Sequence, residues 1–147
     1  MNSDKYILIV NGPNINLTGI RRTDIYGSGS YSDMTAWIEA NAPCHIVVEQ
    51  NNGEGQIIDA LHRAHFDNEC AGVVLNAGAY THYSYAIADA VEAITKPVVE
   101  VHISNILSRE DFRCKSVIAK HCIGSIAGFG WQSYTLALKA LTEHLTN

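Results

Sequence analysis

Near the middle of the chain stands the stretch Ala71-Gly72-Val73-Val74-Leu75, five consecutive residues without a polar side chain. A strand that is covered on both faces has this composition, because neither set of side chains can face water. Similar runs occur at residues 6–10, 46–48, 98–101 and 123–127. Segments with the apolar spacing of helices alternate with these runs, at residues 34–42, 57–64, 85–94 and 134–145.

This alternation of strands and helices predicts a parallel sheet with helices on both faces. Five strands favour a doubly wound, flavodoxin-like α/β fold with the strand order 2-1-3-4-5. The sequence has no linker, repeat or shift in composition, so we expect residues 1–147 to form a single catalytic domain.

The composition argues against several classes of partner. Ten Lys and Arg stand against 15 Asp and Glu, a formal net charge of −5, and no run of basic residues occurs. Such a chain is a poor ligand for nucleic acid or an anionic membrane.

The first apolar run is too short for a signal peptide or a membrane span, so we expect a cytoplasmic protein. The four cysteines form no Cys-x-x-Cys pair and are expected to be reduced.

Polar segments follow three of the predicted strands, at residues 11–16, 76–82 and 100–105. In the order 2-1-3-4-5 these strands are neighbours, and ligands bind at the carboxyl ends of such strands. Asn, Gly and Ser also form ordinary turns. Three such segments on adjacent strands nevertheless favour one ligand-binding cleft.

Two histidines, His82 and His102, fall in this predicted cleft and favour acid–base chemistry. Glu100 lies two residues before His102 on the same strand, so both side chains share a face and the carboxylate could orient the imidazole. His62 and His65 have the spacing of a helix, where a solvated surface is a better interpretation than a metal site.

The strand ends also exclude several cofactors. No Gly-x-Gly-x-x-Gly or Walker-type loop is present, which disfavours nucleotides. The loop after the first strand is not the Ser- and Thr-rich loop of flavin binders, and the strand ends lack the acidic residues that hold a metal. No lysine follows a strand, so a Schiff-base mechanism is not expected. We therefore predict neither metal nor cofactor.

The loop Gly27-Ser28-Gly29-Ser30 is either a mobile flap or an ordinary surface loop.

Several segments together resemble those of the type II 3-dehydroquinate dehydratases, and the resemblance extends from about residue 6 to residue 145. The segments are Asn11-Gly12-Pro13-Asn14-Ile15-Asn16-Leu17, Tyr26-Gly27, Gln50-Asn51-Asn52-Gly53-Glu54-Gly55, Asn76-Ala77-Gly78-Ala79-Tyr80-Thr81-His82, Glu100-Val101-His102-Ile103-Ser104-Asn105 and Gly128-Phe129-Gly130. The chain departs from the usual pattern at Arg22-Thr23-Asp24, Val117 and Trp131.

The resemblance implies reversible dehydration of 3-dehydroquinate, a small-molecule substrate, to 3-dehydroshikimate, without metal or cofactor. It implies that Tyr26 is the base, His102 the acid and Arg21 a lid arginine that stabilises the transition state, and that Asn14 positions a water against the enolate oxygen. The implied substrate contacts are Asn76, His82, Asp89, Ile103, Ser104 and Arg113. It also implies a homo-oligomer, a dodecamer of four trimers, in which Asp89 reaches a neighbouring subunit's site.

The implied chemistry is physically reasonable. The ordinary pKa of tyrosine, about 10, must fall to near neutrality for a phenolate base. One guanidinium at ~4 Å contributes about 4 kcal/mol at an effective dielectric near 20, which is about what this requires. Arg21 is one source, and Arg109 is a second. A related lyase for another cyclic hydroxy acid, or a catalytically silent binding or scaffold protein, are the alternatives. The sequence leaves open whether the reaction serves the shikimate pathway of aromatic amino acid and chorismate biosynthesis or quinate breakdown.

Overall fold

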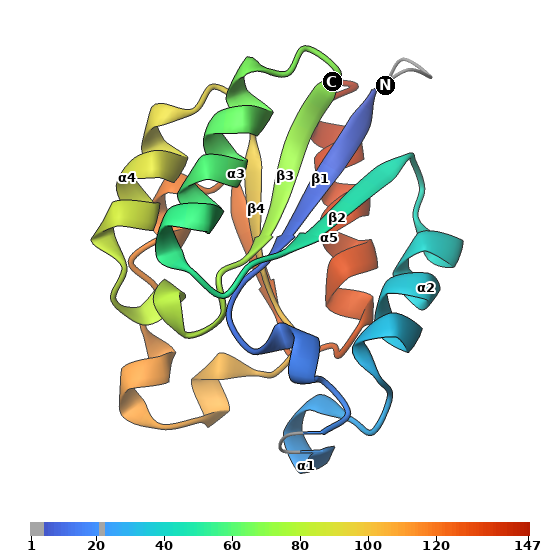
Figure 1. Ribbon diagram of the computed structural model, residues 1–147, viewed down its shortest axis with the longest axis vertical. Coiled ribbons are helices and arrows are strands. Elements are labelled where there is room, and N and C mark those ends of the chain that lie inside the picture. The colour runs from blue at the N-terminus through green and yellow to red at the C-terminus, as the bar shows by residue number, and fades with distance from the viewer. Residues whose placement is uncertain (1–4, 21–22) are drawn as a thin grey trace.

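The computed structural model describes residues 5–20 and 23–147, which contain a five-stranded sheet between two layers of helices (Figure 1). All strand pairs are parallel and the order is β2-β1-β3-β4-β5, which confirms the predicted fold class and strand order. The strands are β1 (Tyr6–Asn11), β2 (Ile46–Gln50), β3 (Cys70–Asn76), β4 (Val98–His102) and β5 (Gly124–Ala127). The α-helices are α1 (Thr23–Tyr26), α2 (Tyr31–Asn41), α3 (Glu54–Phe66), α4 (Tyr85–Ala93) and α5 (Gln132–His144). Short 3-10 turns are η1 (Ile15–Leu17), η2 (Gly78–His82), η3 (Ile106–Ser108), η4 (Asp111–Cys114) and η5 (Ala119–His121).

The core consists of two apolar layers, one on each face of the sheet. Leu8 and Val10 of β1 pack toward α3 and α4, whereas Ile7 and Ile9 pack toward α2 and α5. Figure 1 shows the same division, with α3 and α4 on one side and α2 and α5 on the other. Because successive side chains of a strand point to opposite faces, a strand with both faces covered must be apolar throughout. This explains the uninterrupted runs in the sequence.

Polar caps determine where two of the helices begin. Ser30 accepts a hydrogen bond from the backbone N–H of Asp33, and the Asp33 carboxylate accepts one from the backbone N–H of Ser30, so α2 starts on a capping box. Ser84 caps α4 through the N–H of Ile87. The apolar pattern in the sequence predicts a start of α2 that is three residues too late, because a first turn made of polar residues contributes nothing to that pattern.

The carboxyl ends of β1 and β3 lie in direct backbone contact. The N–H of Gly12 donates to the carbonyl of Asn76 at 2.7 Å. A Cβ atom at Gly12 would lie 2.6 Å from the carbonyl carbon and oxygen of Ala77. Only glycine permits this approach. The segments that follow β1 and β3, which carry residues of the candidate site, are therefore in contact where the two strands end.

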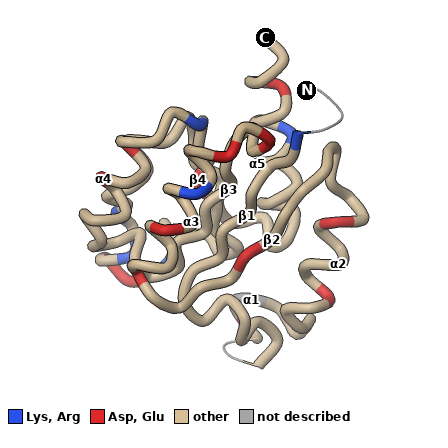
Figure 2. Tube along the Cα trace, turned by 45° about the horizontal axis from the view of Figure 1, so that its top comes forward, with Lys and Arg blue, Asp and Glu red and all other residues tan. Residues whose placement is uncertain are grey.

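Charged residues of both signs are interspersed along the chain trace (Figure 2). In residues 5–20 and 23–147, no helix is long and apolar enough to cross a bilayer.

Candidate active site

A cavity of about 200 Å³, here called the inner cavity, lies at the carboxyl ends of β1, β3 and β4. Asn14 lines it after β1, Asn76 and His102 line it as the last residues of β3 and β4, and His82 and Ser104 line it from the segments that follow these two strands. The three polar strand exits therefore meet, as their places in the sheet predict. Its other lining residues are Pro13, Ile15, Gly78, Ala79, Ile103, Ile106, Arg109 and Arg113.

His102 and Glu100 form a buried pair beneath this cavity. Nε2 of His102 lies 3.1 Å from Oε1 of Glu100, and the side chains are 7% and 0% exposed. Although the distance suits an ion pair, the ring N–H does not point at the oxygen closely enough, and within the described residues Nε2 has no well-aligned hydrogen bond. The pair thus has the arrangement of an imidazole backed by a carboxylate.

Three hydroxyl groups hold the Glu100 carboxylate. Oε1 accepts from Thr81 and, at 2.8 Å, from Ser116, and Oε2 accepts from Ser125 at 3.1 Å. Burial by itself would raise the pKa of Glu100, but the contact with His102 and the hydroxyl donors outweigh it and lower the pKa below its ordinary value. The site therefore holds a fixed negative charge next to His102. The sequence reasoning identified Glu100 but none of its hydroxyl partners.

His82 faces the inner cavity from the β3 side. Its Nδ1 lies 2.8 Å from the carbonyl oxygen of Lys115, which can only accept, so Nδ1 carries the proton in this arrangement. Burial lowers the pKa of His82. Its ring also packs edge-on against Phe112 at 5.8 Å. A neutral imidazole with Nε2 unprotonated suits a hydrogen-bond acceptor for a substrate hydroxyl.

Two asparagines are fixed in different ways. Asn14 has a left-handed backbone with φ 65°, which asparagine tolerates better than most residues, and its N–H donates to Oδ1 of Asn52 at 3.1 Å. Asn76 is buried, and its Oδ1 accepts from the N–H of Gly78 at 3.2 Å. The role of Asn52 as a brace for Asn14 was not predicted, because it depends on a tertiary contact between two loops.

Two arginines border the inner cavity and share one carboxylate. Nε of Arg109 lies 3.5 Å from Oε2 of Glu110, and Nε of Arg113 donates to the same oxygen at 3.1 Å. Nη1 of Arg109 also donates to Oγ of Ser104 at 3.4 Å. The Arg113 guanidinium stacks over the Phe112 ring at 4.7 Å. The cavity therefore has two positioned cations in its wall, one of them in contact with Ser104, an arrangement that suits an anionic ligand.

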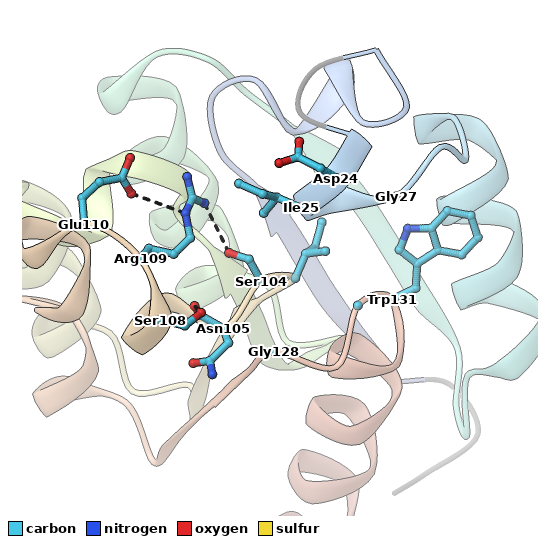
Figure 3. Close-up of a pocket in the computed structure, with 12 residues that line it drawn as sticks. Asp24, Ile25, Gly27, Ser104, Asn105, Ser108, Arg109, Glu110, Gly128 and Trp131 are labelled. Carbon is cyan, nitrogen blue, oxygen red and sulfur yellow. Dashed lines mark hydrogen bonds and ion pairs between the residues drawn. The ribbon is translucent and has the colours of Figure 1, made fainter.

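A second, more open cavity of about 720 Å³, the outer cavity, adjoins the same residues. Ile103, Ser104 and Arg109 line both cavities. Asp24 and Ile25 of α1 lie opposite Arg109 and Ser104, with Trp131 at the far end (Figure 3). Gly27, the first residue of the loop 27–30, therefore borders the outer cavity together with Asp24 and Ile25.

Three predicted residues either lie outside the described part of the structure or line neither cavity. Arg21 lies outside the described residues. The backbone of Tyr26 ends α1, between the cavity-lining residues Ile25 and Gly27, but its side chain lies outside the description. Asp89 is exposed on α4 and lines neither cavity of its own chain.

The remaining histidines lie elsewhere. His62 is exposed on α3, and Nδ1 of His65 accepts from the N–H of Thr95 at 3.2 Å, so both lie away from the two cavities. In the part of the chain that the structure describes, no three His, Cys, Asp or Glu side chains gather as a metal-binding group.

Comparison with known proteins identifies the family of this chain. The family model described as Dehydroquinase class II matches residues 5–142. The 3-dehydroquinate dehydratase of Caldicellulosiruptor saccharolyticus is 52% identical over 144 residues, which cover 96% of this chain and 99% of that protein. The one from an Exiguobacterium species is 55% identical over 143 residues, covering 96% and 97%.

Solved structures give the same result. The crystal structure of type II dehydroquinase from Butyrivibrio crossotus superposes with a TM-score of 0.89 at 41% identity, covering 96% of this chain and 99% of that chain. The type II dehydroquinase from Propionibacterium acnes superposes with a TM-score of 0.88 at 37% identity over the full length of both chains. With a family model that spans almost the whole chain and relatives at about half identity, this chain belongs to the class II dehydroquinase family.

Proposed function

We propose that the protein dehydrates 3-dehydroquinate to 3-dehydroshikimate. The observation that carries the proposal is the inner cavity, which a histidine backed by a buried carboxylate lines together with two asparagines and two arginines. A cyclic acid with several hydroxyls offers a carboxylate for the cations and hydroxyls for the asparagines and His82. Family membership supports the same reaction.

In the first step Tyr26, as phenolate, removes a proton from the carbon beside the ketone, and the electron pair moves onto the ketone oxygen to give an enolate. Arg21 stabilises the charge that develops, and Asn14 positions a water against the enolate oxygen. Arg109 lines the outer cavity together with the residues flanking Tyr26, which supports a part for its guanidinium in keeping that tyrosine ionised.

In the second step the enolate collapses and the carbon–oxygen bond of the β-hydroxyl breaks. His102 donates a proton to the leaving oxygen, so that one molecule of water leaves and the ring gains a conjugated double bond. Glu100, 3.1 Å from Nε2 of this imidazole, orients the ring for the transfer. The complete burial of this carboxylate supports the role, because an attraction between charges is stronger away from water.

The lining of the inner cavity supports the proposed substrate contacts. Ile103 and Ser104 directly follow β4, where a backbone N–H and a hydroxyl can bind the substrate carboxylate. Asn76, His82 and Arg113 are assigned to the remaining oxygens of the substrate.

The decisive experiment is purified protein with 3-dehydroquinate, followed by ultraviolet absorbance of the conjugated product. Tyr26→Phe should lower turnover by about 10²- to 10⁴-fold, the usual contribution of a general base, without lowering thermal stability. Absence of signal from the wild-type protein at high enzyme concentration would contradict the proposed reaction. Near wild-type turnover by Tyr26→Phe would contradict only the identity of the base.

The proposed steps are proton transfers and bond breakage without oxidation or reduction, and they need no metal, cofactor or imine. Among the described residues, no lysine lines either cavity. Turnover should therefore withstand EDTA, and borohydride added with substrate should not inactivate the enzyme. Clear loss of activity under either treatment would contradict this mechanism.

We further propose that residues 1–147 form one catalytic domain of a cytoplasmic homo-oligomer, a dodecamer of four trimers. The exposed position of Asp89 supports a role at a neighbouring subunit's site, as do the exposed aromatic side chains of Tyr83 and Tyr85 near the start of the same helix. Light scattering should give the mass of a large closed assembly; a monomer at micromolar concentration would contradict it.

A further inference from the structure

A buried chain of hydrogen bonds lies directly beneath the inner cavity and is not used by the proposed proton transfers. Its centre is Tyr134 of α5, whose side chain is fully buried. The Tyr134 hydroxyl donates to Oδ1 of Asn11 at 2.6 Å and accepts from Nδ2 of Asn76 at 2.7 Å. Nδ2 of Asn11 in turn lies 3.4 Å from the hydroxyl of Tyr31, the first residue of α2.

The direction of these bonds is fixed by counting protons. A tyrosine hydroxyl has one proton, and here it goes to Asn11, so the hydroxyl can only accept from Asn76. Burial raises the pKa of Tyr134, which keeps this proton in place. On the other side of the Asn76 amide, its Oδ1 accepts the N–H of Gly78. Tyr134 and Gly78 therefore impose the same orientation on the amide.

We propose that Tyr134 is a positioning residue that presents the second side-chain N–H of Asn76 to an oxygen of the substrate. Asn76 has two such protons, and one is taken by Tyr134. The other is left for the inner cavity, which Asn76 lines. Without the hydroxyl, this N–H loses its acceptor, and the amide is held only by the weaker contact of its Oδ1 with the N–H of Gly78 at 3.2 Å. This inference rests on the proposed function, because it needs Asn76 to contact substrate.

The test is Tyr134→Phe, which removes one oxygen atom and keeps the ring. KM should rise about tenfold, the size of one net hydrogen bond, with kcat changed less than about threefold, because Asn76 binds substrate and transition state alike. The Kd for 3-dehydroshikimate, measured by calorimetry, should rise by a similar factor. Tyr6→Phe is the matched control: it also removes a tyrosine hydroxyl bond, to Asp67 at 2.7 Å, but at the opposite end of the sheet. It should leave KM, kcat and Kd unchanged.

A double-mutant cycle separates positioning from general destabilisation. In an Asn76→Ala background, Tyr134→Phe should add less than about twofold to the loss of kcat/KM, since the group that it positions is gone. An equal effect in both backgrounds would overturn the proposal, as would Tyr134→Phe with wild-type KM and Kd. Wild-type turnover is measured first: its absence refutes the proposed function, whereas normal turnover with uncoupled residues refutes only the positioning role.

A crystal structure of the wild-type enzyme with 3-dehydroshikimate bound decides the question even if Tyr134→Phe does not fold. Asn76 Nδ2 should lie within hydrogen-bond distance of both the Tyr134 hydroxyl and a product oxygen. An Asn76 amide turned away from Tyr134, or without contact to the product, would overturn the proposal.

Discussion

Replacing Gly12 by alanine tests the contact on which the arrangement of the site depends. The new Cβ would lie 2.6 Å from two backbone atoms of Ala77 and 3.0 Å from the carbonyl oxygen of Asn76. Ordinary contact begins at 3.4 Å, so the exits of β1 and β3 must separate by about 0.8 Å. No flexible side chain can absorb this movement, because the opposing atoms belong to the backbone.

The expected effects follow from that displacement. Overpacking of a buried site costs about 1–3 kcal/mol, which corresponds to a fall in melting temperature of roughly 3–12 °C for a domain of this size. The hydrogen bond from Gly12 to Asn76 is strained at the same time, and the loop carrying Asn76 and His82 moves. A displacement near 1 Å in a substrate-binding loop lowers kcat/KM by about 100-fold.

The assays are thermal unfolding and steady-state dehydration, with Gly55→Ala as the matched control. Gly55 lies in the first turn of α3, and a Cβ there meets nothing within 4 Å. Alanine at that position should stabilise the helix by about 0.5–1 kcal/mol and leave turnover unchanged. A Gly12→Ala protein with wild-type melting temperature and kcat/KM would refute the close approach of the two strand exits.

Three further predictions concern charges. Glu100→Gln should lower kcat by about 10- to 100-fold, the value of one buried hydrogen bond to a charged group; unchanged kcat would exclude a role for the carboxylate. The hydroxyl of Tyr6 lowers the pKa of Asp67 below its usual value of 3.8, and a backbone N–H adds a smaller lowering. The ionised carboxylate therefore stabilises the fold above about pH 4, and this stabilisation is lost as the pH falls through the lowered pKa. The melting temperature of Tyr6→Phe should therefore fall less steeply in acid than that of the wild type; identical slopes would contradict this. Asp89→Ala should lower kcat/KM, because Asp89 is proposed to reach the site of a neighbouring subunit. Co-expression with Tyr26→Phe subunits should restore activity that neither variant has alone. Wild-type kinetics of Asp89→Ala would contradict this role of Asp89.

The sheet could be predicted from the sequence because its strands are covered on both faces. Burial of both faces leaves an apolar run that needs no knowledge of the partner strand, as at residues 71–75. The four-residue helix α1 was not predicted, since one turn is too short to show a period. The start of α2 was placed too late because it is set by Ser30 and Asp33, which are polar.

The site was predictable where it depended on strand order and unpredictable where it depended on tertiary contacts. The strand ends carrying Asn14, Asn76 and His102 could be brought together from the order 2-1-3-4-5 alone. Ser125 could not be assigned to the site, because it contacts Glu100 only through the pairing of β4 with β5. Tyr134 looked like an ordinary apolar position of the last helix.

The hydroxyls around Glu100 also determine whether this acid could be transplanted. His102 and Glu100 lie two residues apart on β4, which suggests that the pair could be grafted as a single strand onto another parallel sheet. The three donors to the carboxylate, however, come from η2, from the loop before η5 and from β5. A graft of β4 alone would bury a carboxylate that lacks these donors, and such a group takes up a proton rather than remain charged. The unit that can be moved between scaffolds is therefore the whole second half of the sheet with its connections, and not the strand that carries the histidine.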